Sequence, residues 1–478
     1  MPKVQPVFNP DQNLGQLIVK VLEQTPDAIT QISDDTNVSV TCGEMRDRIL
    51  KFAVHLNSLR LKQSDVVGVI AGNTENIAPV VFACFLLGLP INPLAPIMIE
   101  SDIIQVYSKT KPKLIFCDVN NLKIVQNAVD RMKSEAKIYT VMEKIDGYEC
   151  VTDILKKIFN FEDLIYPELD PNSVIFIPCS SGSTGPQKGI CKTYKELLSL
   201  FVPPTIDSHI LYQSTGLFWF SGIYFLLYGA LFKCLRITTA QSTTAELFFN
   251  IIKKYEVTRV STAPYLIINL LQLDNLEPLE SIKMWMIVAA RATEDLCLKL
   301  KKLCQMIVDD NGNALDNNQQ GEIYVKKDYK LTGYYNDMEK FKQVYDGEWF
   351  KTGDIGYIDD EGFLYVIDRK KEVLKYNNMQ ITPVELEEII NQIEGVVSSC
   401  AVGVLEEKTG NDIIHAFVIV DNMKNITEDQ IQNYVNERVI DNKKLRGGIH
   451  FLEKFPTAIT GKIDKKKLRS LAIENFTN

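Results

Sequence analysis

A loop of small, hydroxylated residues carries the most evident chemistry in this chain. Residues 180–188 are Ser-Ser-Gly-Ser-Thr-Gly-Pro-Gln-Lys and follow the apolar run Val174–Ile177. Small side chains let a backbone approach an anion closely, and hydroxyls with a nearby lysine can bind it. We therefore expect phosphate contacts from the following residues: Ser180, Ser181, Gly182, Ser183, Thr184, Gly185 and Lys188.

The loop lacks the G-x-x-x-x-G-K-[ST] spacing of a P-loop, and an ordinary glycine-rich turn favours the same residue types. Three later motifs favour a phosphate site over a plain turn: Lys351-Thr352-Gly353-Asp354, Asp368-Arg369-Lys370-Lys371 and Thr460-Gly461-Lys462. Alone, Asp354 is compatible with a turn aspartate, and Lys462 with one exposed lysine among many. A positioned lysine is nevertheless well suited to stabilise an anionic transition state.

Alternating strand and helix patterns between Val66 and Ala289 must position this loop. Six short apolar runs predict strands: Val66–Ile70, Leu114–Cys117, Ile138–Val141, Val174–Ile177, Thr258–Ser261 and Met284–Val288. Helical patterns lie between or after several of them: Asn76–Leu89, Ala245–Tyr255 and Glu294–Cys304. This alternation predicts parallel sheets with helices on both faces. Ligands bind at the carboxyl ends of such strands, which is where residues 180–188 begin.

After Asp309 the pattern changes to short strands separated by turns: Gly321–Val325, Phe350–Lys351, Gly356–Ile358 and Phe363–Ile367. The last region mixes predicted helices and strands: Val384–Gln392, Glu428–Val439, Ala401–Val404 and Ile413–Val420. We therefore predict an α/β protein with a large domain, residues 1–368, and a small α+β domain, residues 369–478. The boundary is expected near Asp368–Lys371.

Composition excludes several classes of protein. The length of 478 residues exceeds the roughly 250–300 at which single cores stop growing, which supports two domains. A net charge of −9 argues against nucleic-acid or anionic-membrane binding, and the basic run Lys465–Lys467 is expected to be a solvated helix face. Ten cysteines without C-x-x-C spacing and four scattered histidines predict reduced, buried thiols and no metal cluster.

No signal peptide is expected, because the N-terminal residues lack an apolar core. The apolar stretches Ile77–Ile91 and Gly216–Phe232 are shorter than the about 20 residues that a membrane span requires, so we expect buried helices there. The C-terminal Phe-Thr-Asn is not a peroxisomal Ser-Lys-Leu signal. Cytoplasmic and peroxisomal locations both stay open, and the sequence does not indicate an oligomeric state.

From about Asn76 to Leu468 the chain resembles the adenylate-forming superfamily. This superfamily includes acyl- and aryl-CoA synthetases, 4-coumarate–CoA ligase-like enzymes, firefly luciferase-like enzymes and their insect relatives. The order and spacing of the four motifs match with one exception, and the resemblance suggests an insect member. It implies a large N-terminal domain of two doubly wound sheets plus a distorted β-barrel, followed by a small, mobile C-terminal domain.

The resemblance also implies roles for the motifs. Residues 180–188 would be the loop that binds the ATP phosphates, Asp354 and Arg369 would bind the ribose, and Lys462 would be the catalytic lysine. A carboxylic acid would react with ATP, in the presence of Mg²⁺, to give an acyl-adenylate and pyrophosphate. The small domain would then rotate, and the acyl group would pass to coenzyme A.

The segment after the hinge would face the site in the second half-reaction. Lys371 would lie at the hinge, and Lys375 and Gln380 would serve the coenzyme A step. Relatives usually have Tyr-Lys-Gly here, whereas this chain has Tyr376-Asn377-Asn378. Asparagine tolerates the left-handed backbone conformation better than most residues, so we expect the turn to form without glycine.

The region that would hold the acid departs from the resemblance. Trp219 replaces the histidine of an aromatic-histidine gate and is equally compatible with a pocket wall or a core tryptophan. Ala290-Arg291-Ala292-Thr293 replaces a strand end that is usually rich in glycine and alanine. Arg291 could pair with a carboxylate substrate or block the site. The predicted acid and adenine pocket therefore comprises Trp219, Ala290, Arg291 and Ala292.

The largest departure is a missing segment between Cys304 and Val308. Relatives carry several dozen residues there, including Tyr-Gly-x-Thr-Glu, whose glutamate helps to hold magnesium, and this chain contains no match. No metal ligand is therefore identifiable. Three hypotheses follow: an AMP-forming acid–CoA ligase for an apolar acid, as in fatty acid metabolism; a catalytically impaired member that binds nucleotide or an acyl partner; and a splice form or gene model of an ordinary ligase. A luciferase-like monooxygenase is a weaker alternative.

Overall fold

The computed structural model divides the chain into two compact units. The first contains Met1–Arg291 and Tyr329–Phe341, and the second contains Ala292–Asp328 and Lys342–Asn478. The described residues are 8–164, 166–179, 188–201, 209–262, 266, 270, 277–287, 306–308, 317–326, 333–334, 344–360, 364–377, 379–406, 408–421, 426–457 and 463–476. The domain boundary that the sequence predicts near Asp368–Lys371 stays a prediction.

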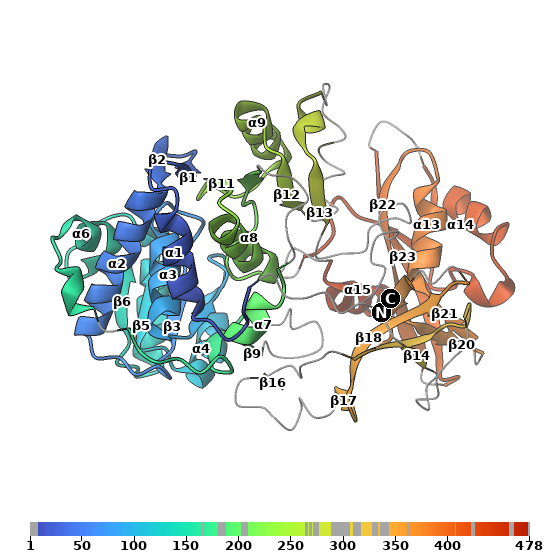
Figure 1. Ribbon diagram of the computed structural model, residues 1–478. Helices are drawn as coiled ribbons and strands as arrows, with labels where there is room; N and C mark the ends of the chain where they lie inside the picture. The colour runs from blue at the N-terminus through green and yellow to red at the C-terminus, as the bar shows by residue number, and fades with distance from the viewer. Residues whose placement is uncertain are drawn as a thin grey trace. The chain divides into compact units, whose positions relative to one another are not determined.

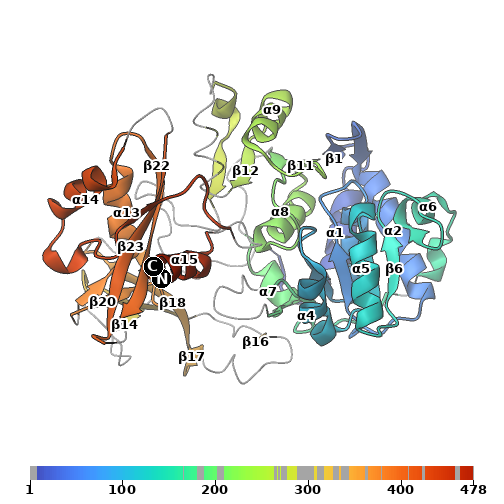
Figure 2. The same cartoon turned by 180° about the vertical axis from the view of Figure 1, so that it is seen from behind.

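The first unit contains an eight-stranded sheet whose central strands are parallel, as the strand–helix alternation predicts. Its strands lie in the order β16 (Gly333–Tyr334), β9 (Ile190–Thr193), β8 (Val174–Phe176), β4 (Ile91–Pro93), β3 (Val67–Ile70), β5 (Leu114–Cys117), β6 (Lys137–Thr140) and β7 (Glu149–Cys150). Its helices are α1 (Leu14–Glu23), α2 (Cys42–Ser58), α3 (Ile77–Leu87), α4 (Glu100–Thr110), α5 (Val119–Arg131) and α6 (Val151–Lys156). Figures 1 and 2 show α1, α2 and α3 on one face of this sheet and α4 and α5 on the other.

A second, six-stranded sheet completes the first unit. Its order is β13 (Met284–Ile287), β12 (Arg259–Thr262), β10 (Ile210–Tyr212), β11 (Leu235–Thr238), β1 (Ile29–Ser33) and β2 (Val38–Thr41), and only the β1–β2 pair is antiparallel. Helices α8 (Phe220–Leu231) and α9 (Ala245–Tyr255) contact this sheet, whereas α7 (Tyr194–Leu198) contacts β9 of the first sheet. The predicted helix at 245–255 is confirmed. The predicted helix at 294–304 lies outside the described residues.

The main core of the first unit gathers around α3. All residues of α3 are buried, because this helix is apolar on every side. It contacts α1 and α2, and α1 also contacts α8, which belongs with the second sheet. The apolar stretches 77–91 and 216–232 thus contain the buried helix α3 and the largely buried helix α8. No helix in the described part of the chain is long and apolar enough to cross a membrane.

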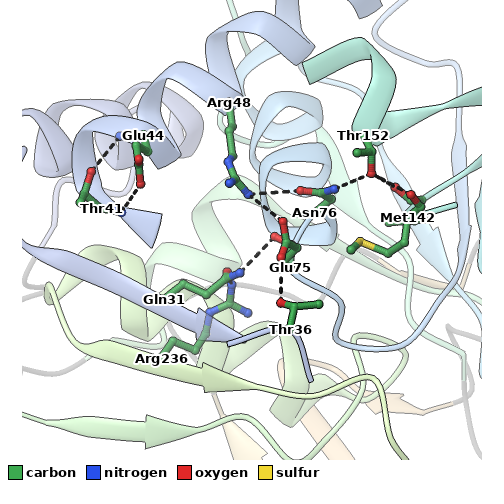
Figure 3. A network of polar contacts seen from close by, with 11 residues as sticks. Gln31, Thr36, Thr41, Glu44, Arg48, Glu75, Asn76, Met142, Thr152 and Arg236 are labelled. Carbon is green, nitrogen blue, oxygen red and sulfur yellow. Dashed lines mark hydrogen bonds and ion pairs between the residues drawn. The ribbon is translucent and has the colours of Figure 1, made fainter. Parts of the chain in front are cut away.

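A polar network fixes the loop between β3 and α3 (Figure 3). The carboxylate of Glu75 accepts hydrogen bonds from Thr36 and Arg48, and its backbone oxygen accepts one from Gln31. Gln31 in turn accepts a hydrogen bond from the buried guanidinium of Arg236 on β11. These contacts join the two sheets within the first unit.

The second unit begins with a sheet whose described strand pairs are all antiparallel. It contains β14 (Met306–Val308), β15 (Gly321–Lys326), β18 (Trp349–Ile358) and β17 (Tyr345–Asp346), and β19 (Leu364–Arg369) also pairs with β18. The sequence predicts separate strands at 350–351 and 356–358, but the structure has one strand. Gly353 and Gly356 interrupt the apolar pattern without ending the strand, and an irregularity near Gly356 absorbs the mismatch.

The rest of the second unit is a compact α+β arrangement, as predicted. Its strands are β20 (Leu374–Tyr376), β21 (Met379–Ile381), β22 (Val396–Glu406), β23 (Asn411–Val420) and β24 (Ile449–Phe451). Its helices are α13 (Pro383–Asn391), α14 (Glu428–Asn436) and α15 (Lys465–Phe476). Side chains alternate between the faces of β22: Ala401 belongs to the cluster with α13 and α14, and Val402 to the cluster with α15.

Candidate active site

The predicted phosphate loop connects two antiparallel strands of the first unit. Cys179 and Gly189 form an isolated bridge, and the amide of Ile190 donates to the oxygen of Pro178 at 2.7 Å. The residues on either side of the loop are therefore adjacent and lie beyond the carboxyl end of β8. Residues 180–187 lie outside the described residues. Lys188, which follows them, is partly buried.

The predicted ribose-binding residues lie together on two neighbouring strands of the second unit. Asp354 on β18 and Arg369 on β19 are register partners, and Arg369 Nε lies 2.8 Å from Asp354 Oδ1. The side chain of Arg369 is 65% exposed and that of Asp354 is 29% exposed. A carboxylate that accepts and a guanidinium that donates suit a vicinal diol, which can both donate and accept hydrogen bonds.

The backbone around Asp354 is held by the adjacent strand. Thr352 Oγ1 donates to the oxygen of Ile323 at 2.8 Å and accepts from the amide of Asp354 at 3.0 Å. Gly353 has φ +73°, a conformation that favours glycine, and its oxygen accepts from the amide of Lys370 at 2.8 Å. The Thr352-Gly353-Asp354 motif thus lies on a strand that is hydrogen-bonded to neighbouring strands on both sides, which fixes the backbone that carries the Asp354 side chain.

The predicted second-half-reaction residues lie around a short hairpin. Lys371 is in a turn, while Lys375 on β20 is the register partner of Gln380 on β21. The structure therefore brings the backbone positions of Lys375 and Gln380 opposite each other in one antiparallel hairpin. Asn377 in the connecting turn has φ +48°, which confirms that asparagine adopts the left-handed conformation there.

Trp219 lies at the N-cap of α8 and is partly buried. Its amide donates to the oxygen of Gly216 at 3.0 Å, which closes a turn before the helix. A Cβ on Gly222 would lie 2.1 Å from that same oxygen, so glycine permits the turn to pack against α8. Ala290, Arg291 and Ala292, the other predicted pocket residues, lie outside the described residues.

The segment that carries Lys462 is held at its base. Thr457 and Ile463 form an isolated antiparallel bridge, and the amide of Asp464 donates to the oxygen of Pro456 at 2.8 Å. Thr460, Gly461 and Lys462 lie outside the described residues. In the sequence they fall between the bridged residues Thr457 and Ile463, shortly before α15.

The prediction of a solvated basic face at 465–467 is wrong for its first residue. Lys466 and Lys467 are exposed, but Lys465 Nζ lies 3.7 Å from Glu387 Oε1, and these side chains are only 23% and 18% exposed. Burial opposes the charge of Lys465, but the nearby carboxylates, first that of Glu387, raise its pKa. Burial also raises the pKa of Glu387. A run of three lysines gives no signal that one of them is paired.

The comparisons with known proteins agree with this arrangement of motifs. The model of the AMP-binding enzyme family matches residues 19–306, and the model of its C-terminal domain matches residues 385–462. The chain therefore belongs to the AMP-binding enzyme family, and the prediction of an adenylate-forming protein is confirmed.

Individual relatives are distant but cover almost the whole chain. A luciferin 4-monooxygenase of Photuris pensylvanica is 26% identical, covering 97% of this chain and 96% of the relative. A probable 4-coumarate–CoA ligase 1 of Dictyostelium discoideum is 25% identical with the same coverage. The first alignment runs over 527 positions, more than the 478 residues of this chain, so the relative contains residues that this chain lacks.

Solved structures share the fold at lower identity. The anthranilate–CoA ligase AuaEII in complex with anthranoyl-AMP gives a TM-score of 0.86 at 17% identity, covering 98% of this chain and 99% of that one. ATP-bound MatB from Rhodopseudomonas palustris gives 0.83 at 18% identity, covering 97% and 100%. The α/β fold with a large N-terminal and a small C-terminal domain is thereby confirmed.

Proposed function

We propose that this protein is an AMP-forming ligase that activates a carboxylic acid with ATP and transfers the acyl group to coenzyme A. The observation that carries the proposal is the pairing of Asp354 with Arg369, which offers an acceptor and a donor to a ribose on one edge of β18 and β19. Membership in the AMP-binding enzyme family and the likeness to CoA ligases support it.

In the proposed first step, a carboxylate oxygen of the acid attacks the α-phosphorus of ATP. The bond to the β-phosphate breaks, and pyrophosphate leaves with its electron pair. Lys462 would stabilise the negative charge that develops on the phosphate oxygens, and the loop at residues 180–188 would bind the phosphates. Mg²⁺ is proposed only as the ion that accompanies ATP, because the described residues contain no group of three acidic, histidine or cysteine side chains that could hold a metal.

In the proposed second step, the thiol of coenzyme A loses its proton and attacks the acyl carbon. The acyl–phosphate bond breaks, AMP leaves, and a thioester remains. Lys375 and Gln380, register partners on one hairpin, would serve this step. The partly buried Trp219 supports an apolar acid, because it puts an aromatic surface where a polar gate residue is expected.

ATP–pyrophosphate exchange with a panel of carboxylic acids, in the presence of Mg²⁺, tests the first step. Exchange with at least one acid is expected, and Lys462→Ala should abolish it while leaving ATP binding intact. Lys466→Ala, which changes an exposed lysine of the same segment, is the matched control. ATP binding without exchange for any acid would instead favour a catalytically impaired member.

A luciferase-like activity is the second candidate, and the likeness to the Photuris luciferin 4-monooxygenase favours testing it. Light emission or oxygen consumption that depends on the acid and ATP would support it over thioester formation. Sequencing the transcript across Cys304–Val308 tests the splice-form hypothesis separately. A longer transcript that encodes Tyr-Gly-x-Thr-Glu there would identify this chain as a shortened form.

A further inference from the structure

Helix α15 presents two cations to acidic side chains from other elements of the second unit. Lys465 and Arg469 are four residues apart, so they share one face of the helix. Lys465 Nζ lies 3.7 Å from Glu387 Oε1 on α13, and the guanidinium of Arg469 lies 2.9 Å from Glu372 Oε2. Glu372 follows Lys371 directly, so α15 is tied both to α13 and to the predicted hinge.

The Glu387 carboxylate is itself held by the sheet. Its Oε1 accepts a hydrogen bond from the amide of Ala401 on β22 at 2.9 Å. The neighbouring thiol of Cys400 is buried, so water has little access to this side of the pair. An ion pair that is shielded from water has a more defined geometry than an exposed one, and losing one partner leaves a poorly solvated charge.

This ion pair lies immediately next to the segment of the proposed catalytic lysine. Lys465 is three residues after Lys462 and starts α15. Between them, Ile463 bridges to Thr457, and the amide of Asp464 donates to the oxygen of Pro456. The position of the bridge and the start of the helix therefore depend on where Lys465 is anchored.

We propose that Glu387 and Lys465 are positioning residues for adenylation, because their ion pair anchors the segment that carries Lys462. The proposal rests on the function proposed above, in which Lys462 stabilises the first transition state. A displacement of about 1 Å at a catalytic group can reduce a rate by about 100-fold. We therefore expect loss of the pair to reduce the adenylation kcat by about 10- to 100-fold, with little change in the KM for ATP.

Hydrogen exchange tests the anchoring without reference to activity. Lys465→Met and Glu387→Gln should accelerate exchange at the amides of Asp464 and Leu468, which donate to the oxygens of Pro456 and Asp464. Lys465→Arg should preserve protection because it keeps the charge. Lys467→Met is the matched control, because Lys467 lies on the same helix, is 67% exposed and forms only a loose pair with Asp464. Unchanged exchange at these two amides in Lys465→Met would overturn the proposal.

Kinetic measurements then distinguish a role of the ion pair in positioning from a role in the stability of the fold. The double variant Glu387→Gln/Lys465→Met removes both charges and should restore the thermal midpoint toward that of the wild type while adenylation stays impaired. Full recovery of adenylation in this double variant would show that the pair only stabilises the fold, and would overturn the proposal. Thioester formation from supplied acyl-adenylate, which does not require Lys462, should change less than about 2-fold.

A double-mutant cycle tests whether the Glu387–Lys465 ion pair acts through Lys462. If it acts through Lys462, Lys465→Met should reduce adenylation less in a Lys462→Arg background, which keeps a cation and residual activity, than in the wild type. An additive loss would contradict the proposal. If the wild type shows no ATP–pyrophosphate exchange, the proposed function is refuted instead. The hydrogen-exchange comparison would still decide whether Glu387 and Lys465 anchor the segment.

Discussion

Replacing Asp354 should weaken ATP binding far more than it weakens the fold. In the proposed site its carboxylate accepts hydrogen bonds from the ribose hydroxyls, while Arg369 lies 2.8 Å away on the next strand. Asp354→Asn keeps the shape and one acceptor oxygen but removes the charge. Asp354→Ala removes both acceptors.

The contributions of Asp354 to the stability of the fold and to ATP binding can be estimated separately. The side chain of Arg369 is 65% exposed, so its ion pair with Asp354 should contribute less than about 1 kcal/mol to stability. A hydrogen bond to a charged group is worth about 1.5–3 kcal/mol, and each 1.4 kcal/mol corresponds to about tenfold in affinity. We therefore expect the Kd for ATP to rise about 10-fold in Asp354→Asn and about 100-fold or more in Asp354→Ala.

Calorimetric titration with ATP measures the affinity, and urea unfolding of the same preparations measures stability. Asp360→Asn is the matched control, because Asp360 is an exposed aspartate just after the same strand. A folded Asp354→Ala variant that binds ATP with the affinity of the wild type would refute the assignment of Asp354 to the ribose. Equal weakening by Asp360→Asn would point instead to a general effect of charge.

Three further predictions concern local structure. Gly222→Ala should destabilise the first unit by more than about 1 kcal/mol, because its Cβ would lie 2.1 Å from a backbone oxygen of the turn before α8. Gly229→Ala should be tolerated, because the atom nearest to its Cβ would be 3.4 Å away. Equal melting temperatures of the two variants would contradict this prediction. Asn377 has φ +48°, so Asn377→Val should lower the free energy of unfolding in urea by about 1–2 kcal/mol, and Asn377→Gly should lower it less. The reverse order would exclude backbone strain as the cause. Burial and the charge of His450 lower the pKa of His415 to about 4 from 6.5, so about 3 kcal/mol of stability, fully present above pH 6.5, should be lost as the pH falls towards 4. Urea unfolding at several pH values measures this loss, and an equal loss in His415→Gln would contradict the assignment.

Much of the strand and helix pattern could be predicted because it depends on local periodicity. The parallel strands of the first unit are short apolar runs, and the structure places β5 at the predicted Leu114–Cys117. The sequence predicts two strands around Gly353 and Gly356 where the structure has one, because glycine weakens a strand pattern even where neighbouring strands hold the backbone. The buried Arg236 has no signal in the sequence, since its partner Gln31 lies on a strand 205 residues earlier.

The sequence by itself determined the family and the order of the motifs, because each motif is a short run whose residue types are dictated by local chemistry. The tertiary structure determined which charged side chains form ion pairs. Asp354 and Arg369 are paired by strand register, and Lys465 is paired with Glu387 from a helix far upstream. Whether a charged side chain is solvated or paired depends on what packs against it, and a local pattern does not contain that information.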